Sequence, residues 1–417
     1  MEFLRAARNF RFGTQRSLRD NDFFADRLSH RHTTKILIVF LLLATFKRFF
    51  TTPISCWVPA ELRRYEKFIN KYCWLQGTYY VDQVYDINTL TIEARNENLL
   101  QYYQWIYFFL LVQAFLFYFP RMIWCFISHR ILDYDLFNMV DAAIKHDTYS
   151  YDHQRILKYL SSNITNHHGN LNDDVPNEAR FIKSIILEKD MKDSKDKKKN
   201  TYGYDSFSFK IIAKKLNKSI LTFTYISIKC LYLVIAILQI YLMNAFLSTK
   251  TNSFFGYEIL TTILRGEADL VQQSDSKIFP RITICDVKTK ELGTDHTYTV
   301  QCVLSFNMFN ERIYAFLWFW IFMILIPFTV IDLISWMKRV ILFGSYNRYQ
   351  YVKSHIKIFN EIDSDRDKFL LKLFTELYLG SDGVFLFRLL EHNSNSIVVS
   401  DLFKSMWVQF KQDYDQQ

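Results

Sequence analysis

The sequence predicts an all-α polytopic membrane protein with four transmembrane helices, two disulfide-tied extracellular loops and a helical cytoplasmic domain. Three observations lead to this fold class. Hydrophobic residues make up 50% of the 417-residue chain and gather into four blocks separated by charged segments. Four of the six cysteines lie in two of those segments, and basic residues are concentrated in the others.

The four apolar blocks are the predicted spans, and they cover residues 33–50, 102–127, 220–248 and 313–336. A span needs about 20 mostly apolar residues to cross roughly 30 Å of hydrocarbon, and the last three blocks meet this requirement. The first block is shorter and ends at Lys47 and Arg48, so it spans the membrane if these side chains reach back to the headgroups. Arg121, Lys229 and Asp332 lie toward the predicted cytoplasmic ends of their spans, where we expect them to snorkel.

Charge assigns the segments between the spans to opposite sides of the membrane. Residues 128–219 and 337–417 carry 16 and 11 basic residues, whereas residues 51–101 and 249–312 carry 5 and 7. Basic residues favour the cytoplasmic side. We therefore predict that the N-terminal segment 1–32, the loop 128–219 and the C-terminal region 337–417 are cytoplasmic. Residues 51–101 and 249–312 become extracellular loops 1 and 2.

The cysteines of these two loops predict a disulfide framework. Cys56 and Cys73 belong to loop 1, and Cys285 and Cys302 belong to loop 2. Thiols oxidise outside the cell and stay reduced in the cytoplasm. Four cysteines allow three connectivities, and the sequence does not choose among them. A zinc site is the alternative, but the four cysteines form no CxxC pair and have no accompanying histidine ligands.

The sequence carries no motif for an enzyme or a cofactor site. A phosphate-binding glycine loop, an HExxH zinc motif and a GxSxG nucleophile elbow are all missing. The run that begins at Asp363 starts like a calcium loop, but Lys368 and Phe374 stand where glycine and glutamate are required. The aromatic residues lie in the apolar blocks, which argues against nucleic acid as a partner. We expect no enzymatic activity, no cofactor and no bound metal.

Four motifs follow one another along the chain in a distinctive order. PISCWVPA occupies residues 53–60, FPRITICD occupies 279–286 and YLGSDGVFLFRLL occupies 378–390. The motif YYQW opens the second span and consists of Tyr102, Tyr103, Gln104 and Trp105. In this order the motifs resemble those of the innexins, the invertebrate gap-junction family related to the pannexins. One departure is that Ile106-Tyr107 replaces the residue and proline that usually follow YYQW in the family.

This resemblance implies a subunit of a large-pore oligomeric channel. Such channels form gap junctions that pass ions and small molecules between adjacent cells. The implied assembly is a ring of about eight copies in the plasma membrane, as closed pore oligomers are symmetric, with both termini cytoplasmic. Its implied partners are a docked ring in the neighbouring cell, other innexins as further subunits, and membrane lipid.

The resemblance also implies roles for individual residues. The disulfides would join the two loops, pairing Cys56 with Cys302 and Cys73 with Cys285. In related channels the N-terminal segment folds into the pore mouth and the first span lies near the pore. The implied pore-lining candidates are Glu2, Arg5, Arg8, Lys47 and Arg48. A basic lining would favour anionic permeants, although a solvated cytoplasmic N-terminus explains its arginines equally well.

Two other functions stay open from the sequence. An undocked hemichannel would release ions and metabolites from a single cell. A four-span adhesion or scaffold protein would share only the topology, and it would carry no conductance.

Overall fold

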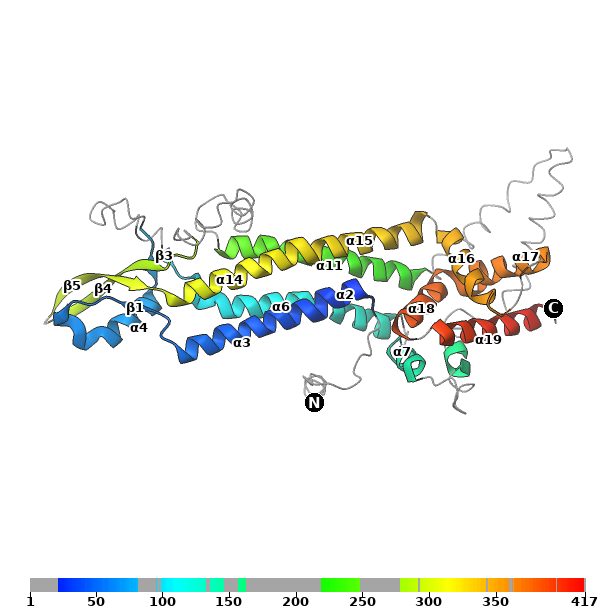
Figure 1. Cartoon of the computed structure of the whole chain (residues 1–417), viewed down its shortest axis with the longest axis horizontal. Coiled ribbons are helices and arrows are strands. Elements are labelled where there is room, and N and C mark those ends of the chain that lie inside the picture. The colour runs from blue at the N-terminus through cyan, green and yellow to red at the C-terminus, as the bar shows by residue number, and fades with distance from the viewer. Residues whose placement is uncertain are drawn as a thin grey trace, which may run out of the picture. The chain divides into compact units, whose positions relative to one another are not determined.

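The computed structural model describes two units of the chain (Figure 1). The sheet unit consists of Ala25–Met122 and Lys229–Leu333, and the tail unit consists of Met1–Phe24, Ile123–Ile228 and Ile334–Gln417. The described residues are 22–81, 95, 99–132, 136–145, 157–162, 219–247, 278–291, 293–342, 344–359, 362, 364–394 and 396–415.

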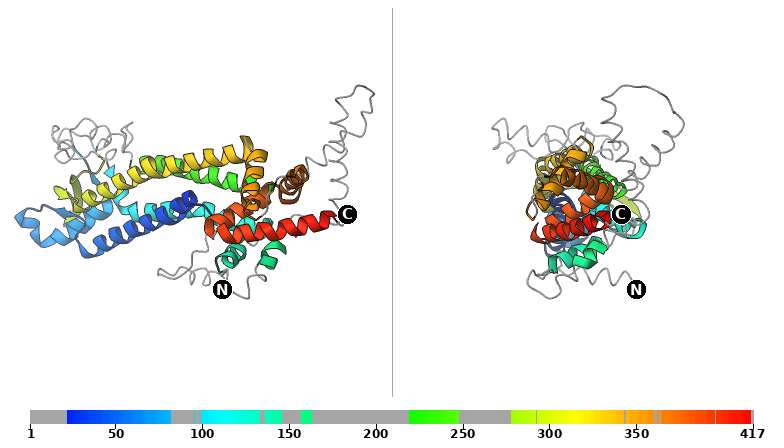
Figure 2. Two further views of the ribbon diagram at one scale, coloured as in Figure 1. Left: turned by 45° about the vertical axis from the view of Figure 1, so that its right-hand side comes forward. Right: turned by 90° about the vertical axis from the view of Figure 1, so that its right-hand side faces the viewer.

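Long helices form the frame of the sheet unit. The first is α3 (Thr34–Phe50), which continues from α2 (Phe24–Arg27) through a π-helical segment, Leu28–Thr33. The others are α6 (Tyr102–Phe126), α11 (Ile220–Leu247) and α14 (Ser305–Phe319), the last of which runs through a π-helical segment, Trp320–Leu325, into α15 (Ile326–Met337). Figures 1 and 2 show α3, α6, α11 and α14 side by side.

Regular spacing of apolar residues explains this packing. On α6, Tyr103, Leu110 and Phe117 recur every two helical turns, and each is fully buried. They share one core with Tyr314 and Leu317 of α14. The opposite faces of these helices keep large apolar side chains exposed, as expected for helices whose outer environment is lipid or a neighbouring subunit.

Among the residues that the structure describes, three helices are long and apolar enough to cross a membrane: Tyr102–Arg130, Ile220–Leu247 and Ser305–Leu342. They contain the predicted spans 102–127 and 313–336 and all but the last residue of 220–248. The third starts earlier than predicted, because residues 305–312, which mix polar and apolar side chains, are also helical. Helix α3 is not among them, since Lys35 and Lys47-Arg48 leave only residues 36–46 without charge. The predicted first span, residues 33–50, therefore stays a prediction.

The fold class is broader than all-α, because the sheet unit also contains a five-stranded antiparallel sheet. Its order is β1 (Ser55–Cys56), β5 (Thr294–Val303), β4 (Ile282–Glu291), β2 (Thr78–Tyr79) and β3 (Leu99–Leu100). Strands β4 and β5 form a hairpin whose register runs from Ile282↔Val303 to Glu291↔Thr294. Loop 1 supplies β1, β2 and β3, so the sheet is shared by both loops.

A short helix of loop 1 packs on this sheet. A 3₁₀ helix, Ala60–Tyr65, leads into α4 (Glu66–Gln76), which contacts β1 and β4. Gly77 ends α4 with φ of +96° and lets the chain turn into β2. A Cβ at this position would lie 3.3 Å from the Leu100 carbonyl oxygen, so a larger residue would crowd β3.

The tail unit is mainly helical in its described residues. It contains the last turns of α6 and α15 and the start of α11. It also contains the π-helical segments Ile127–Ile131, Lys338–Leu342 and Phe374–Leu379, and the helices α7 (Leu136–Lys145), α16 (Gly344–Ile356), α17 (Asp365–Leu373), α18 (Gly380–Asn393) and α19 (Ser396–Asp415). Helix α18 is central, and its Phe387 ring lies 3.9 Å from that of Phe403 on α19. Helix α7, which belongs to residues 128–219, also contacts α18, as expected if the middle loop packs on the C-terminal region.

Candidate functional site

Two disulfides join loop 1 to loop 2 within the sheet unit. Cys56 and Cys302 are register partners on β1 and β5, and they are bonded to each other. Cys73 on α4 is bonded to Cys285 on β4. These are the pairs that the resemblance implies. The sulfurs of Cys56, Cys73 and Cys302 lie within 4.8 Å of one another, but a cysteine in a disulfide offers no thiolate to zinc. Outside this framework, Cys125 and Cys230 are exposed thiols.

The YYQW motif fastens α4 to the start of α6. The Gln104 Nε2 atom donates hydrogen bonds to the carbonyl oxygens of Trp74, at 2.6 Å, and Leu75, at 3.1 Å. These carbonyls belong to the last turn of α4, where no backbone donor remains for them. The Tyr103 ring lies 4.7 Å from the Trp74 ring. Tyr102 and Tyr103 are buried, whereas Trp105 is exposed, and Tyr103 and Gln104 are the motif residues that hold the loop helix on the span.

The start of β4 is fastened to the same helices. The Tyr102 and Phe279 rings meet edge to face at 5.5 Å, and Phe279 also packs against Tyr314 of α14. The buried Asn307 amide of α14 donates a hydrogen bond to the Pro280 carbonyl oxygen at 2.9 Å. The motif residues Phe279 and Pro280, together with Asn307, therefore anchor the second loop where α6 and α14 begin.

A polar network closes the other end of the short strands. The Asp286 carboxylate accepts hydrogen bonds from the Tyr79 hydroxyl at 3.0 Å, the Thr299 hydroxyl at 2.7 Å and the Arg95 guanidinium at 3.1 Å. Burial raises the pKa of Tyr79, and the Asp286 charge raises that pKa further. The phenol therefore stays protonated and remains a donor. Asp286 thus links β2, β4 and β5.

Lys47 and Arg48, at the end of α3, rest on aromatic rings. The Lys47 ammonium lies 4.6 Å from the centre of the Phe309 ring, and the Arg48 guanidinium lies 5.0 Å from that of Tyr107. Cations are attracted to such ring faces. Lys47 is half-buried and Arg48 is exposed. Their role at a pore stays a prediction. The other pore-lining candidates, Glu2, Arg5 and Arg8, lie outside the described residues.

Lys229 corrects one prediction. Its ammonium lies 3.0 Å from both carboxylate oxygens of Asp26 and forms a further ion pair with Asp332. The Lys229 side chain is 3% exposed, whereas those of Asp26 and Asp332 are 5% and 26% exposed. The expectation that Lys229 snorkels is wrong, because its charge is neutralised inside the helix bundle of the sheet unit.

Comparison with known proteins identifies the chain as a whole. The sequence profile of the innexin family matches residues 22–410.

The chain belongs to the innexin family.

Curated relatives agree over nearly the full length of this innexin. Innexin unc-9 of Caenorhabditis elegans is 32% identical over 391 residues, which cover 93% of this chain and 92% of the relative. Innexin-11 of the same nematode is 30% identical over 407 residues, covering 94% and 79%. Innexin-19 of Caenorhabditis briggsae is 28% identical over 421 residues, covering 95% and 88%. The resemblance inferred from the motifs is confirmed.

Membership fixes the general function of this innexin. Innexins are plasma-membrane proteins that form oligomeric gap-junction channels, and the apolar helices and disulfides described above agree with that role.

The sequence indicated the motif positions of this innexin but not the contacts that their side chains make. Sequence reasoning missed Gln104 as the cap of α4 and Asp286 as a link among strands. It also missed the Asp26–Lys229–Asp332 triad, although a lysine and an aspartate inside apolar blocks are a signal for a mutual partner.

Proposed function

We propose that this innexin is a subunit of a large-pore ring that docks with a ring in the neighbouring cell and passes ions and small molecules between the two. The observation that carries the proposal is the pair of disulfides that unites loop 1 and loop 2 in one sheet. Crosslinks restrict the conformations of segments that have little core of their own. A rigid face of this kind, made by β1–β5 and α4, is what docking requires, and we call it the docking face.

The surface of loop 1 supports contact with another chain. Among the described residues of this loop, four large apolar side chains are exposed: Trp57, Tyr65, Phe68 and Leu75. Exposed apolar groups of this kind mark surfaces that are covered in an assembly. We assign them to contacts between subunits of a ring or between docked rings.

The proposed topology has four spans, at 33–50, 102–127, 220–248 and 313–336, with both termini in the cytoplasm. Two observations support it. The bonded cysteines lie in loops 1 and 2, which is expected of an oxidising exterior. On α3, Leu42, Phe46, Phe49 and Phe50 are exposed, which suits a helix in contact with lipid or a neighbouring subunit.

The proposed pore is lined by Glu2, Arg5 and Arg8 of the N-terminal segment and by Lys47 and Arg48 of the first span. Their net positive charge would favour anionic permeants. The ring has about eight subunits, made of this chain alone or with other innexins.

Junctional conductance between paired cells that express this chain alone tests the proposal, with single-cell membrane current as its companion. Junctional current is the expected result. Membrane current without junctional current would replace the docked channel by an undocked hemichannel. If surface-expressed protein gave neither current, even together with a second innexin, the channel function would be refuted in favour of a scaffold.

A further inference from the structure

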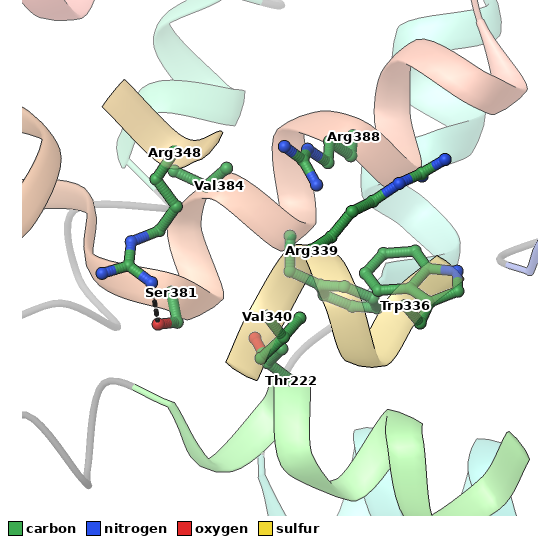
Figure 3. Close-up of a pocket in the computed structure, with 9 residues that line it drawn as sticks. Thr222, Trp336, Arg339, Val340, Arg348, Ser381, Val384 and Arg388 are labelled. Carbon is green, nitrogen blue, oxygen red and sulfur yellow. Dashed lines mark hydrogen bonds between the residues drawn. The ribbon is translucent and has the colours of Figure 1, made fainter. Parts of the chain in front are cut away.

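A small pocket in the tail unit gathers three arginines (Figure 3). Its polar lining comes from four helical segments: Thr222 at the start of α11, Arg339 just after α15, Arg348 on α16, and Ser381 and Arg388 on α18. Trp336 forms part of its apolar wall.

Two of these arginines have no carboxylate partner. Arg348 is neutralised, because its guanidinium lies 3.0 Å from the Glu376 carboxylate. Arg339 and Arg388 form no ion pair with any residue that the structure describes. Their contacts are with rings: Arg388 lies 4.9 Å from the centre of Tyr351, and Arg339 lies 5.9 Å from that of Trp336. Two positive charges thus share one pocket without a direct ion pair, and Glu391, the acid whose charge acts on Arg388, already accepts a hydrogen bond from the Tyr351 hydroxyl.

One neighbouring acid, Asp382, does not supply an ion pair to these arginines. Asp382 follows Ser381 in sequence, but its carboxylate accepts the backbone N–H groups of Leu221, at 3.1 Å, and Thr222, at 2.9 Å, and the Thr222 hydroxyl at 2.7 Å. It therefore caps the start of α11. Burial lowers the pKa of Arg388, and the charges of Arg339 and Arg348 lower it further, whereas Tyr351 and Glu391 oppose the shift.

Hydrogen-bond donors in the pocket also lack acceptors. The Nε atom of Arg348 is buried and donates to no acceptor that the structure describes. Its Nη1 atom donates to the Ser381 hydroxyl at 3.2 Å, which leaves the hydroxyl proton of Ser381 for another acceptor. Buried donors of this kind are rare unless a ligand or water satisfies them.

We propose that this pocket binds a phosphate group, carried either by a lipid headgroup or by a soluble anion. Guanidinium groups match phosphate oxygens with paired hydrogen bonds. A bound phosphate would bridge the ends of α11 and α15 to α16 and α18 within the tail unit, and would so connect two long helices to the C-terminal helices.

The source of the phosphate depends on the proposed topology, whereas the pocket does not. In that topology Trp336 ends the fourth span at the inner membrane surface, and Arg339 follows it at the depth of inner-leaflet headgroups. A lipid phosphate is then within reach. A soluble phosphate would need only the pocket itself.

Binding to the full-length oligomer in phosphatidylcholine nanodiscs tests the proposal. One arm titrates short-chain phosphatidylinositol 4,5-bisphosphate, and the other titrates inositol trisphosphate as a soluble probe. Arg339→Gln and Arg388→Lys are the test variants, since the first removes an exposed charge and the second keeps the charge but loses the paired donors. Lys338→Gln is the matched control, because it removes one charge next to Arg339 but outside the pocket lining.

We expect saturable binding that Arg339→Gln and Arg388→Lys each weaken by about tenfold, whereas Lys338→Gln changes it by less than about twofold. Binding in the lipid arm alone would assign the site to a headgroup, and binding in both arms would admit soluble phosphates as well. Equal losses for Lys338→Gln and Arg339→Gln, or no saturable binding in either arm, would overturn the proposal. Because the readout is binding, its failure is distinguishable from a failure of channel function.

Discussion

Replacing Lys229 with methionine tests how the helix bundle of the sheet unit tolerates its buried charges. Methionine keeps much of the volume of lysine but removes the ammonium that Asp26 and Asp332 share. The Asp26 side chain is 5% exposed, so its carboxylate cannot rehydrate, and it would face a second carboxylate. Removing one partner of a buried ion pair costs about 3–5 kcal/mol. We expect the free energy of unfolding to fall by that amount, which changes the folded-to-unfolded ratio by more than about a hundredfold.

Asp332→Asn is the matched comparison. It leaves Lys229 bound to both oxygens of Asp26 at 3.0 Å, so a neutral pair remains. The Asp332 side chain is 26% exposed, and we expect a loss below about 1 kcal/mol. Asp26→Asn combined with Lys229→Met should be milder than Lys229→Met alone, because the remaining carboxylate of Asp332 reaches water.

Thermal and denaturant unfolding of the purified oligomer, followed by size-exclusion chromatography, measures these differences. The expected order of loss is Lys229→Met, then the double variant, then Asp332→Asn. If Lys229→Met unfolded together with the wild type, or if Asp332→Asn lost as much stability as Lys229→Met, the triad would not be the buried charge balance described above.

Three further predictions follow from the docking face and the tail unit. Serine in place of any bonded cysteine should abolish junctional current measured between paired cells, whereas serine in place of the two exposed thiols should preserve it; the bonded set is Cys56, Cys73, Cys285 and Cys302, and the controls are Cys125 and Cys230. Gln104→Leu leaves two carbonyls of α4 without their donor and should lower the free energy of unfolding by about 1–3 kcal/mol, whereas the exposed Trp105→Ala should not; equal losses in chemical denaturation would contradict the capping role. Burial lowers the pKa of His355, although Glu391 opposes the shift, so the unfolded state binds the proton first and the free energy of unfolding should fall as the pH drops below about 6.5. The difference between the melting temperatures at pH 7.5 and pH 5.5 should therefore be smaller in His355→Gln than in the wild type. An unchanged difference would exclude His355 as the cause.

The elements that the sequence predicted well are those with long periodic signals. The apolar run from Tyr102 is one continuous helix, and the loop cysteines are bonded across loops as the family resemblance implied. Strands β1, β2 and β3 could not be predicted, because two residues cannot show an alternating pattern. Strands β1 and β2 form because they pair with the long β4–β5 hairpin, which lies about 200 residues away in the chain, and β3 pairs in turn with β2.

The charged residues in the spans were harder to interpret for a different reason. Snorkelling and ion pairing both place a lysine near the end of an apolar run. The partners of Lys229 are 203 and 103 residues away in sequence, so only the packed helices bring the three charges together. The arginine pocket is similar, since Arg339, Arg348 and Arg388 are ordinary basic residues until α15, α16 and α18 place them around one space.

The shared sheet imposes an order on the biosynthesis of each subunit. Cys56 must wait for Cys302, which is 246 residues later, and Cys73 must wait for Cys285, which is 212 residues later. At about 5–20 residues per second, a ribosome takes on the order of 12–50 s to supply the later cysteine of the longer pair. During that interval Cys56 and Cys73 have each other as nearest thiols, and a local bridge between them would be premature. The arrival of the β4–β5 hairpin directs both cysteines to their final partners, so a chain truncated before Val303 cannot mature its first loop. The first loop can therefore be oxidised correctly only after the second loop has been synthesised.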